Sequence, residues 1–82
     1  MKKKFKLAGI TWEVVDQKIT ECGFTDPNTF TIALNTSLSP QGKEVTFYHE
    51  LVHAIMFTMG EQAHDERFVE GFAQLLYQFN KQ

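Results

Sequence analysis

The segment between Ser39 and Gly60 constrains the fold of this 82-residue chain most strongly. Serine is a favoured N-cap, proline at position 40 suits the first helical position, and glycine commonly ends a helix. Between these signals, apolar residues recur at spacings of three and four, which is the period of an amphipathic helix. The sequence therefore predicts one long helix that runs from about Pro40 to Met59.

This predicted helix carries the motif H-E-x-x-H, with His49, Glu50 and His53 at its three defined positions. Residues four positions apart lie on one face of a helix, so the two imidazoles can bind one metal ion. The motif predicts zinc, which in catalytic sites takes three protein ligands and a water. Glu50 is the predicted catalytic residue, because a carboxylate beside that water can accept its proton and pass it to the leaving amine.

The residues before this helix have the alternating polar and apolar pattern of half-buried strands. Lys4–Leu7 and Ile10–Val14 flank Ala8-Gly9, which predicts a β-hairpin. Thr29–Asn35 alternates in the same way, and we expect it to be a third strand that pairs antiparallel with the hairpin. The stretch between residues 16 and 28 is rich in turn formers, so it predicts a connection, with one short helical turn near Gln17–Glu21.

A second helix is predicted from about Asp65 to Phe79, after a short link formed by Glu61–His64. The chain is then a single α+β domain over residues 1–82, a three-stranded antiparallel sheet followed by a two-helix hairpin, which is a minimal zincin-like arrangement. The buried stripe expected on the second helix consists of Phe68, Phe72, Leu75, Leu76 and Phe79.

Three residues that follow the pentad His49–His53 could each supply the third zinc ligand. His64 has the spacing of the metzincin pattern H-E-x-x-H-x-x-G-x-x-H, but Met56 stands where that pattern has glycine. If the two helices fold antiparallel about the middle of the link, Glu70 lies almost level with His53. Glu66 lies one turn from Glu70, where it could orient a ligand histidine. Glu70 is therefore the predicted ligand, and Glu66 stays open as the alternative.

Composition narrows the range of partners. The net charge of −2 argues against nucleic acid, and the 43% of hydrophobic residues are sufficient for a folded core. No apolar run is long enough for a signal peptide or a membrane span, so we expect a cytoplasmic protein without a membrane partner. The single cysteine, Cys22, excludes an internal disulfide and a cysteine-based metal site. The oligomeric state is left open.

The pentad and the following stretch Glu66–Leu76 resemble the small bacterial and phage metallopeptidases of gluzincin type, of which the ImmA/IrrE family is the best known. The resemblance covers roughly Thr29 to Phe79. It implies a zinc site with His49 and His53 as ligands and a downstream glutamate, Glu70, as the third, with the motif glutamate as the catalytic residue. The chain departs from the family pattern around Phe72-Ala73-Gln74-Leu75-Leu76, where the register is one residue short.

Two functions follow as expectations. The first is a zinc metallopeptidase, specifically an endopeptidase, that acts on a protein or peptide substrate such as a regulator. The substrate is expected to lie as an added strand along Thr29–Asn35, and Tyr48, His64 or Tyr77 could stabilise the oxyanion. The second is a non-catalytic, zinc-stabilised interaction domain, for example a phage accessory protein.

Overall fold

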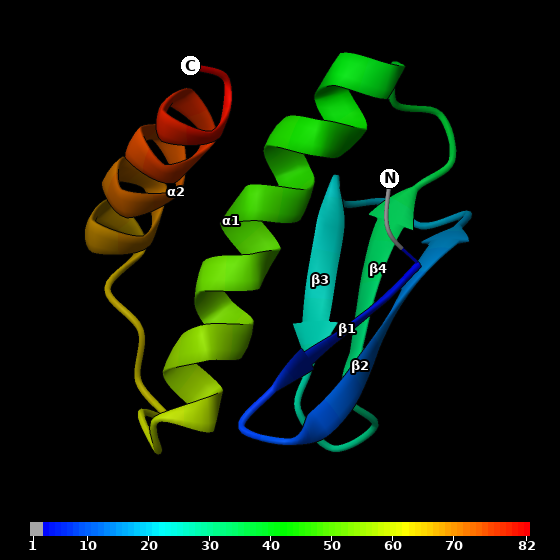
Figure 1. Ribbon diagram of the computed structural model, residues 1–82. Helices are drawn as coiled ribbons and strands as arrows, with labels where there is room; N and C mark the ends of the chain where they lie inside the picture. Colours follow the sequence, from blue (N-terminus) through cyan, green and yellow to red (C-terminus); the bar gives the residue numbers. More distant parts are fainter. Residues whose placement is uncertain (1–2) are drawn as a thin grey trace.

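The computed structural model describes residues 3–82 as a sheet with two helices on one side of it (Figure 1). Helix α1 lies between the sheet and helix α2, so the molecule has three layers. Met1 and Lys2, which belong to the predicted domain, lie outside the described residues. In chain order the elements are β1 (Lys4–Leu7), β2 (Ile10–Gln17), β3 (Gly23–Asp26), β4 (Thr31–Asn35), α1 (Pro40–Thr58) and α2 (Glu66–Asn80).

The sheet has four strands in the order β1-β2-β4-β3. The α+β class and the two-helix hairpin are confirmed, but the expected three-stranded antiparallel sheet is wrong in two respects. It lacks β3, and β4 pairs with β2 in parallel, with Val14 opposite Ile32. The reason is a double reversal of the chain, because β3 runs back along the sheet before β4 turns again. Since β3 pairs antiparallel with β4, β4 regains the direction of β2.

Strand β3 lies where the sequence predicted a connection, and glycine makes its position possible. A Cβ atom at Gly23 would lie 2.7 Å from the carbonyl oxygen of Ala33 and 2.8 Å from Cγ2 of Thr46, so only glycine fits between β4 and α1. The helical turn expected near Gln17–Glu21 is absent, because β2 continues to Gln17 and the next residues have no regular structure. The side-chain amide of Asn35 holds this segment by donating hydrogen bonds to two of its backbone carbonyls.

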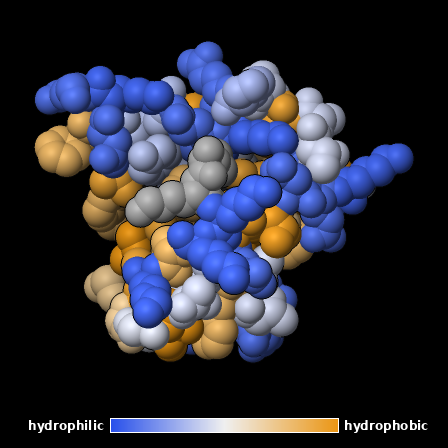
Figure 2. All heavy atoms as spheres, turned by 45° about the vertical axis from the view of Figure 1, so that its right-hand side comes forward, coloured by the Kyte–Doolittle hydropathy of each residue, from blue (hydrophilic) through white to orange (hydrophobic). Residues whose placement is uncertain are grey.

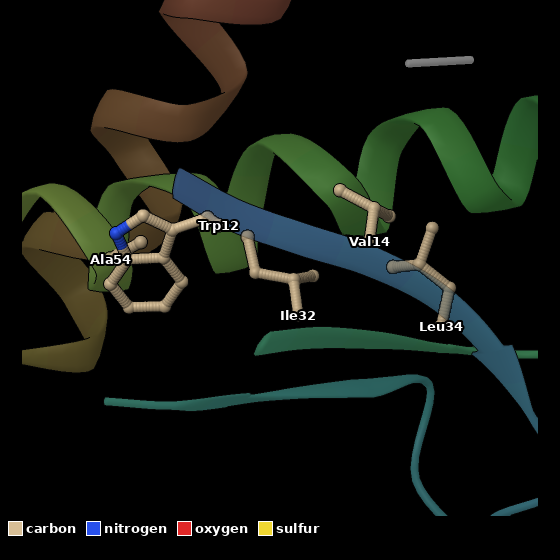
Figure 3. Packing of buried hydrophobic residues seen from close by; sticks show 5 residues of the cluster. All are labelled: Trp12, Val14, Ile32, Leu34 and Ala54. Carbon is tan, nitrogen blue, oxygen red and sulfur yellow. The ribbon is translucent and has the colours of Figure 1, made fainter. Parts of the chain in front are cut away.

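The predicted hairpin is confirmed. Ala8 and Gly9 both have positive φ, 50° and 80°, as a two-residue type I′ turn requires. Trp12, Ile32 and Leu34 are fully buried against α1, and Figure 3 shows Ala54 of that helix beside the indole of Trp12. Figure 2, which brings the sheet side forward, shows hydrophilic side chains spread over much of that face.

The limits of both helices agree with their sequence signals. The hydroxyl of Ser39 accepts a hydrogen bond from the amide of Gly42, and the carboxylate of Asp65 accepts one from the amide of Arg67. Gly60, with φ at 89°, follows the end of α1. Within residues 3–82, neither helix combines the length and the apolarity that are needed to cross a bilayer.

The buried stripe that the sequence predicted on α2 is wrong for four of its five residues, and the fifth, Leu76, is half-buried. The residues of α2 that are buried are Val69 and Ala73, which pack against Val52 of α1. These side chains are small, so they let the two helices approach closely. The exposed large side chains of the helix are Phe68, Phe72, Leu75 and Phe79.

Candidate metal centre

The pentad of α1 opens into a cleft of about 510 Å³. The cleft lies where α1 meets β3 on one side and the start of α2 on the other. The link between the helices contributes Gln62 and His64 to its lining. The lining residues are Gly23, Phe24, Thr25, His49, Glu50, His53, Phe57, Gln62, His64 and Glu66.

Glu66 faces both histidines of the motif. Its Oε1 lies 3.3 Å from Nε2 of His49 and its Oε2 lies 3.3 Å from Nε2 of His53. One ligand atom from each of the three residues can be chosen so that all lie within 4.8 Å of one another. Donors bound tetrahedrally at about 2.0–2.1 Å from one zinc ion are roughly 3.3 Å apart, so these side chains are spaced as zinc ligands would be.

Glu70, the ligand expected from the sequence, lies on the other side of the His49 ring. Its Oε1 is 2.9 Å from Nδ1 of His49, and its Oε2 accepts a hydrogen bond from the side-chain amide of Gln74 at 3.2 Å. Each oxygen of Glu70 thus has a partner other than Nε2 of His49 or His53. The sequence predicted that Glu70 lies level with His53, whereas in the structure it contacts His49.

The extended link explains this difference in register. The chain between Gly60 and α2 has no helical hydrogen bonding and climbs along α1 before the second helix begins (Figure 1). An extended residue advances about 3.3 Å, more than twice the 1.5 Å of a helical residue. A link folded symmetrically would place Glu66 level with Thr58. The extended one carries Glu66 up to His53 instead.

His64 contacts the second motif histidine. Its Nε2 lies 2.8 Å from the carbonyl oxygen of Glu61, and its Nδ1 lies 2.6 Å from Nδ1 of His53. A carbonyl oxygen can only accept, so Nε2 of neutral His64 carries the proton and Nδ1 is an acceptor. The proton between the two Nδ1 atoms then belongs to His53. Nε2 of His53 is left with a lone pair directed at Glu66.

The same reasoning applies to His49, whose Nδ1–H donates to the carboxylate of Glu70. Nε2 of both motif histidines thus faces the carboxylate of Glu66. With both rings neutral and protonated at Nδ1, two lone pairs and a carboxylate meet there, and a cation between them would satisfy all three. Two neutral imidazoles and one carboxylate are a donor set of catalytic zinc, so the residues present fit that metal.

His53 is also electrostatically suited to bind a metal. Burial lowers its pKa below the usual value of histidine, since an imidazolium loses more solvation than a neutral ring. Glu50 and Glu66 act against this shift, while His49 and His64 add to it. The lowered pKa favours the neutral ring at pH 7, which is the form that binds metal.

Glu50 is buried, with 8% of its surface exposed, and still lines the cleft. The hydroxyl of Thr25 lies 2.7 Å from its Oε1 and 3.0 Å from its backbone carbonyl oxygen, so it donates to either. Gly23 lets β3 come this close to α1. A Cβ atom at this position would lie 3.5 Å from Cγ of Glu50 and would collide with Ala33 and Thr46. Strand β3 thus orients the carboxylate next to His49 and His53.

The structure separates the other residues that the sequence suggested. Tyr48 and Tyr77 pack ring against ring at 5.7 Å between α1 and α2, outside the cleft lining, whereas His64 lies in it. β4 lies between β2 and β3, so the expectation that Thr29–Asn35 offers a free edge is wrong. The sequence analysis did not identify Thr25. The pattern Gly-x-Thr, which is typical of a short strand, could have indicated it, but the many turn-forming residues around it favoured a connection.

One comparison with known proteins gave a match. A family model with the description IrrE N-terminal-like domain, named Peptidase_M78, matches residues 10–75, which is most of the chain. No curated protein and no solved structure is significantly similar to it. The match includes the whole pentad and the start of α2, and it supports the resemblance to the ImmA/IrrE family.

Proposed function

Because the chain belongs to the IrrE N-terminal-like domain family, we propose that it is a zinc-dependent metallopeptidase, and specifically an endopeptidase. The observation that carries the proposal is the meeting of Nε2 of His49, Nε2 of His53 and the Glu66 carboxylate in one cleft with the buried Glu50. A purely structural metal site has no need of a carboxylate beside it, whereas peptide hydrolysis needs a general base.

His49, His53 and Glu66 would hold the metal, which makes the site one of gluzincin type. Glu66 replaces Glu70 in this role because its two oxygens face Nε2 of both histidines. Glu70 instead fixes the ring of His49 through Nδ1, as acceptors behind metal-binding histidines commonly do. Zinc, when bound, supplies a Lewis acid that polarises the scissile carbonyl and lowers the pKa of a coordinated water to about 7.

Glu50 would accept the proton of the attacking water and deliver it to the leaving amine. The hydroxyl of Thr25 engages Oε1, so its hydrogen bond fixes the plane of the carboxylate and leaves Oε2 to take the proton. These separate roles of Oε1 and Oε2 require a carboxylate that is held in one orientation. Thr25 acts in this scheme as a positioning residue.

The substrate would lie along the free edge of β3. This strand pairs with β4 on one side only, and its residues Phe24 and Thr25 line the cleft. An extended peptide that adds to this edge through main-chain hydrogen bonds would pass beside Glu50 and the metal ligands. The substrate class is therefore an extended segment of a protein or peptide.

Cleavage of a peptide mixture tests the proposal. We expect the zinc-loaded chain to cut peptides, the chelated chain to cut none, and zinc added back to restore cleavage. Mass spectrometry of the products checks this and identifies the bonds that are cut. Stoichiometric zinc binding without cleavage of any peptide would instead support a zinc-stabilised interaction domain.

The contact between His64 and His53 leads to a separate prediction on metal affinity. His64→Phe should weaken zinc binding by about 10- to 100-fold, because it removes the acceptor for Nδ1–H of His53. Phenylalanine keeps an aromatic ring where His64 stacks on His53 and Phe57, so the loss would come from the hydrogen bond and not from packing. Competition with a chromophoric chelator measures the affinity, and Gln62→Ala in the same cleft is the control.

Unchanged zinc affinity in His64→Phe would show that the contact has no part in metal binding. A loss as large as that of Glu66→Gln would instead identify His64 as a direct ligand.

A further inference from the structure

The outer face of α2, formed by Phe68, Phe72, Leu75 and Phe79, is a row of large apolar side chains exposed to solvent. Their exposed fractions are 53%, 47%, 67% and 70%. The row lies beside the side of α2 that packs on α1 through Val69 and Ala73. The fold of one copy therefore buries the small apolar residues of this helix and leaves the large ones uncovered.

The spacing of these residues is that of a helix–helix seam. They follow one another at intervals of four, three and four, an average of about 3.7 residues that is close to the 3.6 of one helical turn, so the row stays on one face of α2. No charged residue interrupts the row. The rings of Phe68 and Phe72 already contact each other edge to face, with centroids 5.6 Å apart, so part of the seam is ordered in the single copy.

The exposed area of this row is sufficient for a dimer. A phenylalanine offers roughly 150–250 Å² of surface, so at these exposed fractions the four side chains present about 450 Å². That lies within the range of the largest apolar patches on monomers, which are often functional. Two such rows packed together, with the flanking polar atoms, would bury on the order of 1,000 Å², which is the area a specific interface needs.

We propose that the chain forms a two-fold symmetric dimer in which the outer face of α2 packs antiparallel against the same face of a second copy. A two-fold axis makes an interface self-complementary, and a uniform apolar row can pair with itself without leaving any charge unpaired. The axis would pass between Phe72 and Leu75, so Phe72 of one copy would lie opposite Leu75 of the other, and Phe68 opposite Phe79. This arrangement also sets the helix dipoles antiparallel.

The dimer would leave the cleft open and steady the helix that lines it. Glu66 and Glu70 reach His49 and His53 from the side of α2 that faces α1, away from the outer face. α2 packs on α1, and its fully or nearly buried residues are Val69 and Ala73. A second copy would cover the outer face of α2, which α1 leaves exposed. The proposal stands independently of the peptidase activity.

Sedimentation equilibrium from low to high micromolar concentration tests the dimer. We expect the mass of the native chain to approach twice that of one copy as the concentration rises. Leu75→Glu should remain monomeric, because it places a charge in the middle of the seam. The matched control is Gln78→Glu, which adds the same charge to an exposed position outside the row and should still dimerise. Circular dichroism verifies that both variants are folded.

A native chain that stays monomeric at every concentration would overturn the proposal and leave the face to another kind of partner. A dimer that Leu75→Glu does not weaken would overturn it as well.

Cysteine cross-linking tests the antiparallel arrangement in a Cys22→Ser background, since Cys22 is exposed. A mixture of Phe68→Cys and Phe79→Cys chains should form a disulfide-linked pair that joins one chain of each kind. Either variant alone should give little cross-linked product. Efficient cross-linking of Phe68→Cys to itself would contradict the antiparallel pairing, because it requires parallel helices.

Discussion

Glu50→Gln is expected to reduce peptide hydrolysis by about 100- to 10,000-fold, the usual contribution of a general acid–base group. Glutamine has nearly the same shape, and its amide oxygen can still accept the hydrogen bond that Thr25 donates to Oε1. It has no basic site for the proton of the attacking water. Since Glu50 lies beside the proposed ligands and is not one of them, zinc content should not change.

The measurement is kcat/KM on a peptide that the native chain cuts, together with zinc content from elemental analysis. Glu13→Gln makes the same change at an exposed position of β2, outside the cleft lining, and should leave both quantities unaffected. Cleavage by Glu50→Gln at the native rate would remove Glu50 from the mechanism. It would leave the metal site itself in place.

Glu66→Gln is expected to weaken zinc binding by more than the 10- to 100-fold that the loss of an orienting residue costs. Glu70→Gln should fall within that smaller range, because Glu70 contacts His49 through Nδ1 and not through the nitrogen that faces Glu66. The two substitutions are chemically identical and lie one helical turn apart. The difference between their zinc affinities therefore reports the position of the carboxylate and not the loss of its charge.

Zinc competition titrations on both variants give the ranking, with Glu61→Gln as a control in the link. The side chain of Glu61 does not line the cleft, so this variant should bind zinc as the native chain does. A greater loss in Glu70→Gln than in Glu66→Gln would restore the ligand that the helix register suggested. It would also mean that the link rearranges when the metal binds.

The parts of the site that could be predicted from sequence are those set by local geometry. His49 and His53 share a face because they are four residues apart on one helix, and the caps at Ser39 and Gly60 define that helix. Glu50 follows from the same motif. None of these inferences depends on how distant parts of the chain pack together.

The choice of the proposed third ligand depends on the path of the link, which no periodic pattern encodes. Glu66 and Glu70 lie on the same face of α2, so helical spacing cannot distinguish them. The extended residues after Gly60 shift α2 by about one and a half turns, and this shift brings Glu66 to Nε2 of both histidines. The contact of Thr25 with Glu50 is likewise tertiary, since β3 reaches α1 only through the missing side chain of Gly23.

The long helix, its H-E-x-x-H motif and the amphipathic second helix were determined by the sequence alone, because hydrogen bonding and side-chain spacing within one element set them. Tertiary structure decided which apolar stripe of α2 is buried, which glutamate meets the histidines and which strand forms the edge of the cleft. The physical reason is the close approach of the two helices. Val69 and Ala73 permit it, whereas Phe68 and Phe72, too large for that contact, remain at the surface.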